Sequence, residues 1–177
     1  MTIADLKPEH VEQLVALFQR LPDSDLTFIK EDVSPAAVTR WIDAPGWRWV
    51  DLAEDGSVIG YAALRAQTGW SDHVGDLRLV VDPAARGRGV GRALTLHALG
   101  HALRSGLLKV VVELPAEQTR TIDMFLGLGF TGEALLRDHF RDRTGQLRDL
   151  VMLAHFAEQT YEAMDLVGVA DALEEGL

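Results

Sequence analysis

The stretch VVDPAARGRGVGR, residues 80–92, decides how this chain folds. Its apolar part ends at Val81, an Asp-Pro pair stops the strand, and an apolar segment with helical spacing starts near Val90. The three alternating glycines in between lack the Cβ atoms that would keep a ligand off the backbone. Free amide groups at the start of the helix then point at one place, where three arginines add positive charge. The stretch therefore predicts a phosphate or pyrophosphate site, with a solvated strand-to-helix turn as the alternative.

Outward from this turn, the apolar pattern predicts strands and helices in succession. Before the turn we expect strands at residues 2–6, 47–52, 58–64 and 74–81 and helices at residues 8–21 and 34–41. After it we expect a helix at 90–104, a strand at 107–114, a helix at 119–128 and a final hairpin of strands at 130–140 and 147–156. A strand, a core helix and a further strand imply a crossover between parallel neighbours. The predicted fold class is α/β with a mixed sheet.

The composition is that of an ordinary globular protein. The 177 residues are 47% hydrophobic and 25% charged, which suits one sizeable core and is short for two domains. The lack of cysteine excludes disulfides, thiolate metal sites and a cysteine nucleophile. A net charge of -10 disfavours a nucleic-acid partner. Because the sequence shows no leader and no membrane-spanning run, we expect a cytoplasmic protein without membrane contact.

Residues 157–177 stand apart from the rest of the chain. They contain six acidic residues and no lysine or arginine, and their apolar residues are spaced loosely as in a helix. We therefore expect one domain at residues 1–156 and an acidic helical extension at 157–177. The extension is either solvated or docks on a partner, such as the second copy in a homodimer.

Two familiar phosphate-binding loops do not match the glycine turn. The P-loop needs Gly-Lys-Ser/Thr at the helix start, which is absent here. A dinucleotide fingerprint needs a third glycine or alanine, and Arg92 or Leu94 stands there, depending on the first glycine counted. Because Glu113 ends the next strand, where a ribose-binding acid would lie, a nicotinamide-dinucleotide enzyme stays an alternative.

Two motifs lie in order on either side of the predicted core helix. They are Arg86-x-x-Gly89-x-Gly91, after Val81-Asp82-Pro83, and Glu113-Leu114-x-x-x-Gln118 followed by Phe125-x-x-Leu128-Gly129-Phe130. Together they resemble the signature of the GNAT superfamily of acetyl-CoA-dependent N-acyltransferases. The resemblance covers residues 46–156 well and the first 45 in outline. It implies a central mixed sheet, flanked by helices, that splays where two parallel strands part and holds acetyl-CoA in the gap. The extra C-terminal helix is not part of it.

The resemblance also implies where acetyl-CoA binds. The pyrophosphate would lie on the backbone amides of residues 87–92, and the pantetheine arm would pair with the main chain of residues 79–81 like an added strand. Gln118 stands where the family often has asparagine, and Phe125 where many members have a tyrosine that protonates the leaving thiolate. Phenylalanine cannot donate a proton, so position 125 is the main departure. The expected cofactor-binding residues are Leu79, Val80, Val81, Arg86, Gly87, Arg88, Gly89, Val90, Gly91, Arg92, Gln118 and Phe125, and no metal is expected.

Acetyl transfer to an amine needs a neutral nitrogen. A lysine-like amine with a pKa near 10.4 is almost wholly protonated at pH 7, a handicap of roughly 5 kcal/mol, so a positioned base is expected. Glu113 matches the location of a general-base glutamate in some members of the family. Asp76, on the preceding strand, is the alternative base, and a plain ion-pair role for Glu113 stays open.

The acceptor side of the site is less defined. In this family the N-terminal helices and the last hairpin select the acceptor, which here means residues 23–32, with Phe28 and Glu31, and residues 137–148. We interpret His97 and His101 as structural, and we expect Trp70 to be the tryptophan that reaches a ligand. His73 and His139 would relay protons if they lined the cleft.

Three functions therefore compete. The first is an N-acetyltransferase that uses acetyl-CoA as co-substrate on a primary amine of a small molecule or protein. The second is a non-catalytic acyl-CoA-binding or regulatory module that has lost the acid at position 125. The third is the nicotinamide-dinucleotide enzyme.

Overall fold

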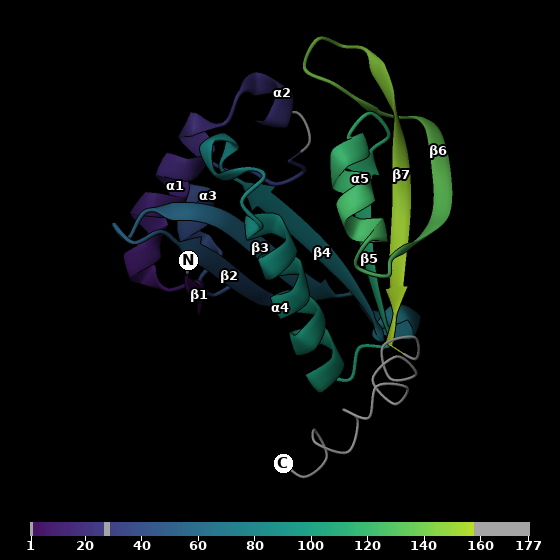
Figure 1. Ribbon diagram of the computed structural model, residues 1–177, viewed down its shortest axis with the longest axis horizontal. Coiled ribbons are helices and arrows are strands. Elements are labelled where there is room, and N and C mark those ends of the chain that lie inside the picture. Colours follow the sequence, from purple (N-terminus) through teal and green to yellow (C-terminus); the bar gives the residue numbers. More distant parts are fainter. Residues whose placement is uncertain (1, 27–28, 158–177) are drawn as a thin grey trace.

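The computed structural model describes residues 2–26 and 29–157, which form one seven-stranded sheet with helices on both faces (Figure 1). The strands are β1 (Thr2–Asp5), β2 (Trp47–Leu52), β3 (Val58–Ala66), β4 (Val74–Val81), β5 (Lys109–Pro115), β6 (Thr131–Arg141) and β7 (Leu147–Phe156). The helices are α1 (Val11–Arg20), α2 (Asp23–Leu26), α3 (Pro35–Arg40), α4 (Val90–Arg104) and α5 (Thr119–Leu126). The strand order is β1-β2-β3-β4-β5-β7-β6.

The parallel strands β4 and β5 separate along their length. Within the described chain, Val74–Asp76 of β4 pairs with Lys109–Val111 of β5, and the pairing between them goes no further. β4 then continues beside β3 to Val81, whereas β5 continues beside β7 to Pro115. The two carboxyl ends diverge, as Figure 1 shows. The prediction of a mixed sheet that splays between two parallel strands is confirmed.

The sheet separates two apolar cores because successive side chains of a strand point to opposite faces. Trp49 lies in the core under α4 and α5, and its neighbour Val50 lies in the core under α1 and α3. α4 packs closely on β3 at Gly60, where a Cβ atom would lie 2.7 Å from side-chain atoms of both Val90 and Leu94. This close packing places the N-terminus of α4 beside the opening between β4 and β5.

The observed element boundaries differ from the predicted ones in the N-terminal region. The helix predicted at residues 8–21 is a 3-10 turn over Pro8–His10 followed by α1. The short helix α2, which the aspartate-rich sequence did not predict, follows at once. None of the helices that the structure describes has the length and apolar character needed to span a bilayer. The helical extension predicted at residues 157–177 falls, apart from its first residue, outside the described part of the chain.

Candidate active site

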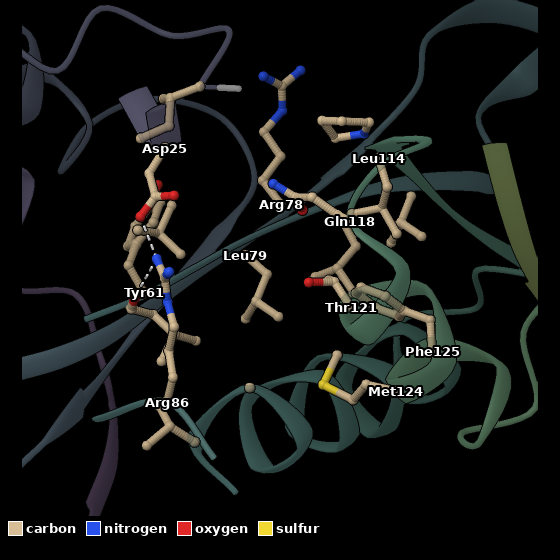
Figure 2. Close-up of a pocket in the computed structure, with 18 of the residues that line it drawn as sticks. Asp25, Tyr61, Arg78, Leu79, Arg86, Leu114, Gln118, Thr121, Met124 and Phe125 are labelled. Atoms are coloured by element: carbon tan, nitrogen blue, oxygen red, sulfur yellow. Dashed lines mark hydrogen bonds and ion pairs between the residues drawn. The ribbon is translucent and has the colours of Figure 1, made fainter. Parts of the chain in front are cut away.

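A cavity of about 970 Å³ occupies the opening between β4 and β5. Its walls come from an N-terminal segment that contributes Asp25 and residues 29–31, the second half of β4, the glycine turn, the end of β5 and the first turns of α5. Figure 2 shows Asp25, Tyr61 and Arg86 on one side of this cavity and Gln118, Thr121, Met124 and Phe125 on the other, with Leu79 between them. Segments far apart in sequence therefore share one site.

The glycine turn presents backbone groups to the cavity. Gly87 has φ +73° and Gly89 has φ +87°, and a Cβ atom on either would meet nothing within 4 Å. Gly89 is the N-cap residue of α4, and the first helical amide to donate back, that of Ala93, bonds to the Gly89 carbonyl at 2.9 Å. The amides of the preceding turn have no acceptor within the helix. The turn thus offers free N–H groups and open space, which is what an anionic group needs.

Arg86 lies at the edge of this turn. Its guanidinium pairs with the Asp25 carboxylate of α2 and also approaches the Val81 carbonyl at 3.5 Å, as the dashed lines in Figure 2 show. Arg86 and Arg92 both line the cavity, whereas Arg88 does not. Positive charge therefore stands at the end of the cavity nearest the glycine turn.

The candidate base Glu113 lies in the last part of β5 and lines the cavity. Its side chain is 26% exposed, and its Oε2 atom forms an ion pair with Nζ of Lys30 from the N-terminal segment. The sequence did not suggest this pair, because its partners are separated by 83 positions and Lys30 belongs to no motif. The N-terminal segment is thereby tied to β5 across the site.

The alternative base Asp76 also lines the cavity, on β4. It accepts a hydrogen bond of 3.0 Å from Arg78, whose other terminal nitrogen lies 3.8 Å from Glu31. An arginine stays charged at every relevant pH, so Asp76 has a permanent cationic partner. Glu113 differs because its partner is a lysine, which can lose a proton.

The α5 side of the cavity carries both residues predicted from the second motif. Thr121, Met124 and Phe125 point toward the cavity from α5, and Gln118 does so from the N-cap position of this helix (Figure 2). Phe125 is 1% exposed, and its ring packs edge-on against Phe130 with centroids 5.0 Å apart. The Thr121 hydroxyl was not predicted, although its place one turn before Phe125 on the same helix is a usable signal.

An aromatic group lies on the β3 side of the cavity. Trp41 and Tyr61 stack with ring centroids 5.3 Å apart, and Phe18 packs edge-on against both. Burial raises the pKa of Tyr61, with a smaller contribution from Glu31. Tyr61 therefore stays protonated at neutral pH. No motif contained this group, and it depends on three elements that only the fold brings together.

Most of the predicted site residues meet at this cavity. Leu79, Val80, Val81, Arg86, Gly87, Gly89, Val90, Gly91, Arg92, Glu113, Gln118 and Phe125 all line it, and of the predicted set Arg88 alone does not. Trp70, predicted to reach a ligand, is instead 97% exposed and does not line the cavity, because the loop between β3 and β4 holds it in solvent.

The other side chains singled out from the sequence have different places. His73, His139 and residues 137–148 do not line the cavity, and within the hairpin Arg143 pairs with Asp23 of α2 at 2.9 Å. His97 and His101 pack on Trp49 with ring centroids 5.2 and 5.1 Å apart, in agreement with a structural role. Phe28 lies outside the described residues.

Comparisons with known proteins agree with this arrangement. A sequence model described as the acetyltransferase (GNAT) family matches residues 11–130. A mycothiol acetyltransferase of Nocardia farcinica is 32% identical over 103 residues, which are 57% of this chain and 34% of that protein. The match thus spans about a third of the length of this curated relative.

Solved structures share the fold. The ribosomal-protein-alanine N-acetyltransferase of Brucella melitensis superposes with a TM-score of 0.80 at 20% identity, over 88% of this chain and 99% of that one. A phosphinothricin acetyltransferase of Sinorhizobium meliloti, in complex with AcCoA, gives a TM-score of 0.78 at 20% identity, over 88% and 87% of the two chains.

Proposed function

Since the chain belongs to the acetyltransferase (GNAT) family, we propose that it transfers the acetyl group of acetyl-CoA to a primary amine of a small molecule or protein. One observation carries the proposal: a single cavity joins the free amides of the glycine turn to a carboxylate at the end of β5. An anion-binding end and a proton-accepting end are the two parts that this reaction needs.

The residues present fit acetyl-CoA. The amides at the N-terminus of α4 would hold its pyrophosphate, with Arg86 and Arg92 beside it. β4 has a free edge beyond Asp76, where the arm of the cofactor would pair with residues 79–81. Gln118 would contact the same arm from the N-cap position of α5. Acetyl-CoA supplies the activated acetyl group.

Glu113 would take the proton of the acceptor amine. It stands at the cavity, and its lysine partner is replaceable by an incoming ammonium group of the same kind. Asp76 is less suited to the role, because its carboxylate already accepts a hydrogen bond from the permanently charged Arg78. Glu113 therefore acts as base directly or through water.

The cavity lining has a balanced formal charge. Five carboxylates line it, those of Asp25, Glu31, Asp76, Glu113 and Glu117, together with five cationic side chains, those of Lys30, Arg78, Arg86, Arg92 and Arg120. Three ion pairs join the two sets, Arg86 with Asp25, Lys30 with Glu113 and Arg78 with Asp76, so the charge of the lining does not by itself select a cationic acceptor. The match covers only about a third of the mycothiol acetyltransferase relative. We therefore do not carry over that protein's substrate, and we define the acceptor only as a primary amine.

Phe125 supports a second candidate, a module that binds acyl-CoA without turnover. The buried ring offers no proton to the leaving thiolate. A ligand panel separates the candidates: we expect CoA and acetyl-CoA, but not NAD, to raise the unfolding temperature. We also expect thiol release from acetyl-CoA with a pool of amines. Protection without thiol release would favour the binding module, and protection by NAD alone would overturn the proposal.

A further inference from the structure

Lys30 places a primary amine of the chain itself inside the candidate active site. The chain has three lysines, Lys7, Lys30 and Lys109, and Lys30 is the one that lines the cavity among the described residues. Its Nζ atom contacts Oε2 of Glu113, the carboxylate to which we assign the role of base. The amine therefore stands where an acceptor amine must stand to give up its proton.

The surroundings of Lys30 act on its amine in opposite directions. Burial lowers the pKa of the Lys30 amine and Arg78 lowers it further, whereas Asp76 raises it and the ion pair with Glu113 favours the charged form. A lower pKa increases the neutral fraction at pH 7, which reduces the handicap that an ordinary lysine has as a nucleophile. The side chain is still 51% exposed, so it is free to move toward a bound thioester.

A second lysine of the chain provides a comparison. Lys109 also forms an ion pair with a glutamate, Glu133, but neither residue lines the cavity. Lys109 has the carboxylate partner and lacks the neighbouring acetyl-CoA site. Comparing the acetylation of Lys30 and Lys109 therefore distinguishes the effect of a neighbouring carboxylate from the effect of the candidate active site.

We propose that Lys30 is an internal acceptor, so that the chain acetylates its own Lys30 when acetyl-CoA is bound. The inference rests on the proposed acetyl-CoA-dependent function. The neutral Nζ atom attacks the thioester carbonyl carbon, so that an N–C bond forms and the C–S bond breaks. Glu113 accepts the proton that leaves nitrogen, and the sulfur leaves as the CoA thiolate, which takes a proton from water. The products are Nε-acetyl-lysine at position 30 and free CoA.

The modification would change the site. Acetylation removes the positive charge of Lys30, so the ion pair to Glu113 is lost. Glu113 is then free to receive the amine of a separate acceptor. The first turnover would thus break the ion pair between Lys30 and Glu113 and leave Glu113 accessible to the amine of a separate acceptor.

The test follows acetyl occupancy at all three lysines. The purified full chain is incubated with isotope-labelled acetyl-CoA, and peptides containing Lys7, Lys30 and Lys109 are quantified by mass spectrometry over time. We expect labelling of Lys30 to exceed that of Lys109 by roughly 10²-fold, the contribution of a positioned base. Lys30→Arg should remove the signal, Glu113→Gln should slow it, and Glu133→Gln should leave it unchanged.

Acetyl groups already present on purified protein are informative as well. If Lys30 arrives fully acetylated in the wild type and not in Glu113→Gln, the inference is supported without any labelling. The rate per molecule should also be independent of protein concentration, because the reaction occurs within one chain. A rate that rises with protein concentration would show transfer between copies and would overturn the inference.

The inference and the proposed function fail in different ways. If the protein binds acetyl-CoA and releases CoA with added amines, but Lys30 is labelled no faster than Lys7 and Lys109, the inference alone is overturned. If acetyl-CoA does not bind and all three lysines show the same slow background, both are overturned. Binding is measured on the same samples by calorimetry.

Discussion

Arg20 donates two hydrogen bonds to Oδ2 of Asp82, from Nε at 3.0 Å and from Nη2 at 2.8 Å. The same Nη2 group donates to the Val58 carbonyl at 3.2 Å, and Oδ1 of Asp82 accepts from the Ala84 amide at 2.9 Å. The end of α1 is thereby tied to the residue at which the glycine turn starts. Because Asp82 is buried, its charge depends on this partner.

Replacing Arg20 should therefore destabilise the chain. Arg20→Met keeps most of the aliphatic stem and removes all three hydrogen bonds, so we expect a loss of about 1–3 kcal/mol in the free energy of unfolding. Urea denaturation at neutral pH measures it. Arg40→Met, at an exposed position in α3, is the control and should change little. An equal effect of both variants would contradict the role of the Arg20 contact.

The same contact predicts a pH dependence. Burial acts to raise the pKa of Asp82, but hydrogen bonds from Arg20 and Ala84 outweigh it and hold the pKa below 3.8. A carboxyl with a lowered pKa contributes stability above its ordinary pKa, and that stability is lost as the pH falls toward the lowered value. The difference between wild type and Arg20→Met should thus shrink in acid. A difference that grows below pH 4 would contradict this assignment.

Gly89→Val tests the glycine turn. A β-branched residue at φ +87° is strained whatever the space, at a cost of about 1–3 kcal/mol, and relief of the strain must move the amides at the start of α4. We expect acetyl-CoA binding to be lost in calorimetry while the fold is kept. Gly56→Val is the matched control, with φ +81°, equally open surroundings and a place outside the cavity. Retained affinity in Gly89→Val would count against the cofactor site.

Glu113→Gln tests the base. The amide has the size of the carboxylate and accepts no proton, so we expect the rate of acetyl transfer at neutral pH to fall roughly 10²- to 10⁴-fold. The affinity for acetyl-CoA should change little, since Glu113 is assigned to the acceptor amine. Glu133→Gln, which also removes a lysine-paired carboxylate, should keep the wild-type rate. An undiminished rate in Glu113→Gln would move the role to Asp76 or to solvent.

Sequence reasoning located the glycine turn because the turn is built from one contiguous stretch of the chain. A strand end, a glycine turn and a helix start are contiguous, so the spacing of Gly87, Gly89 and Gly91 already describes one structure. The second motif placed Gln118 and Phe125 on the same wall of the cavity for the same reason, since Gln118 is the N-cap residue of the short helix that carries Phe125. The parallel pairing of β4 and β5 followed from the core helix that connects them, whereas the order of the other strands in the sheet was not predicted.

Sequence reasoning pointed to residues 23–32 but not to the contacts that they make, because those contacts join distant segments. Lys30 meets Glu113 and Arg86 meets Asp25 only after the N-terminal segment has folded over the sheet. Tyr61 and Trp41 come together from β3 and the end of α3. Trp70 was misplaced because a tryptophan in a polar loop resembles a ligand contact, whereas the loop in fact projects into solvent.

Asp51→Asn should stabilise the chain at neutral pH. The Asp51 side chain is 0% exposed, and within the described residues neither carboxyl oxygen has a hydrogen bond of good geometry, although the Thr2 amide lies nearby. Burial raises the pKa of Asp51 above its ordinary 3.8. A carboxyl with a raised pKa contributes stability in acid, where it is protonated in the folded chain. This contribution is lost as the pH rises through the raised pKa, so ionised Asp51 opposes folding at pH 7.

The neutral amide removes that cost, and we expect a gain of about 1–3 kcal/mol in the free energy of unfolding at pH 7. The difference in free energy of unfolding between Asp51→Asn and the wild type should become smaller in acid, where wild-type Asp51 is protonated. Chemical denaturation at several pH values measures both effects. Asp43→Asn, at an exposed position, should change neither. A gain for Asp51→Asn that is the same at every pH would contradict the assignment to ionisation.

Phe125→Tyr tests the absent acid. A CoA-like thiol with a pKa of about 8.5 lies some 1.5 units above neutral, so expelling an unprotonated thiolate sacrifices roughly 2 kcal/mol relative to a placed donor. This cost is smaller than the roughly 5 kcal/mol that protonation of the acceptor amine costs at pH 7. We therefore expect slow but measurable turnover in the wild type. Because Phe125 lines the cavity from α5, a hydroxyl on its ring should preserve acetyl-CoA binding and raise the rate. Phe130→Tyr, on the adjacent buried ring outside the cavity, should bring no gain. If the wild type binds acetyl-CoA without any turnover and Phe125→Tyr creates it, the binding module becomes the better account of this chain.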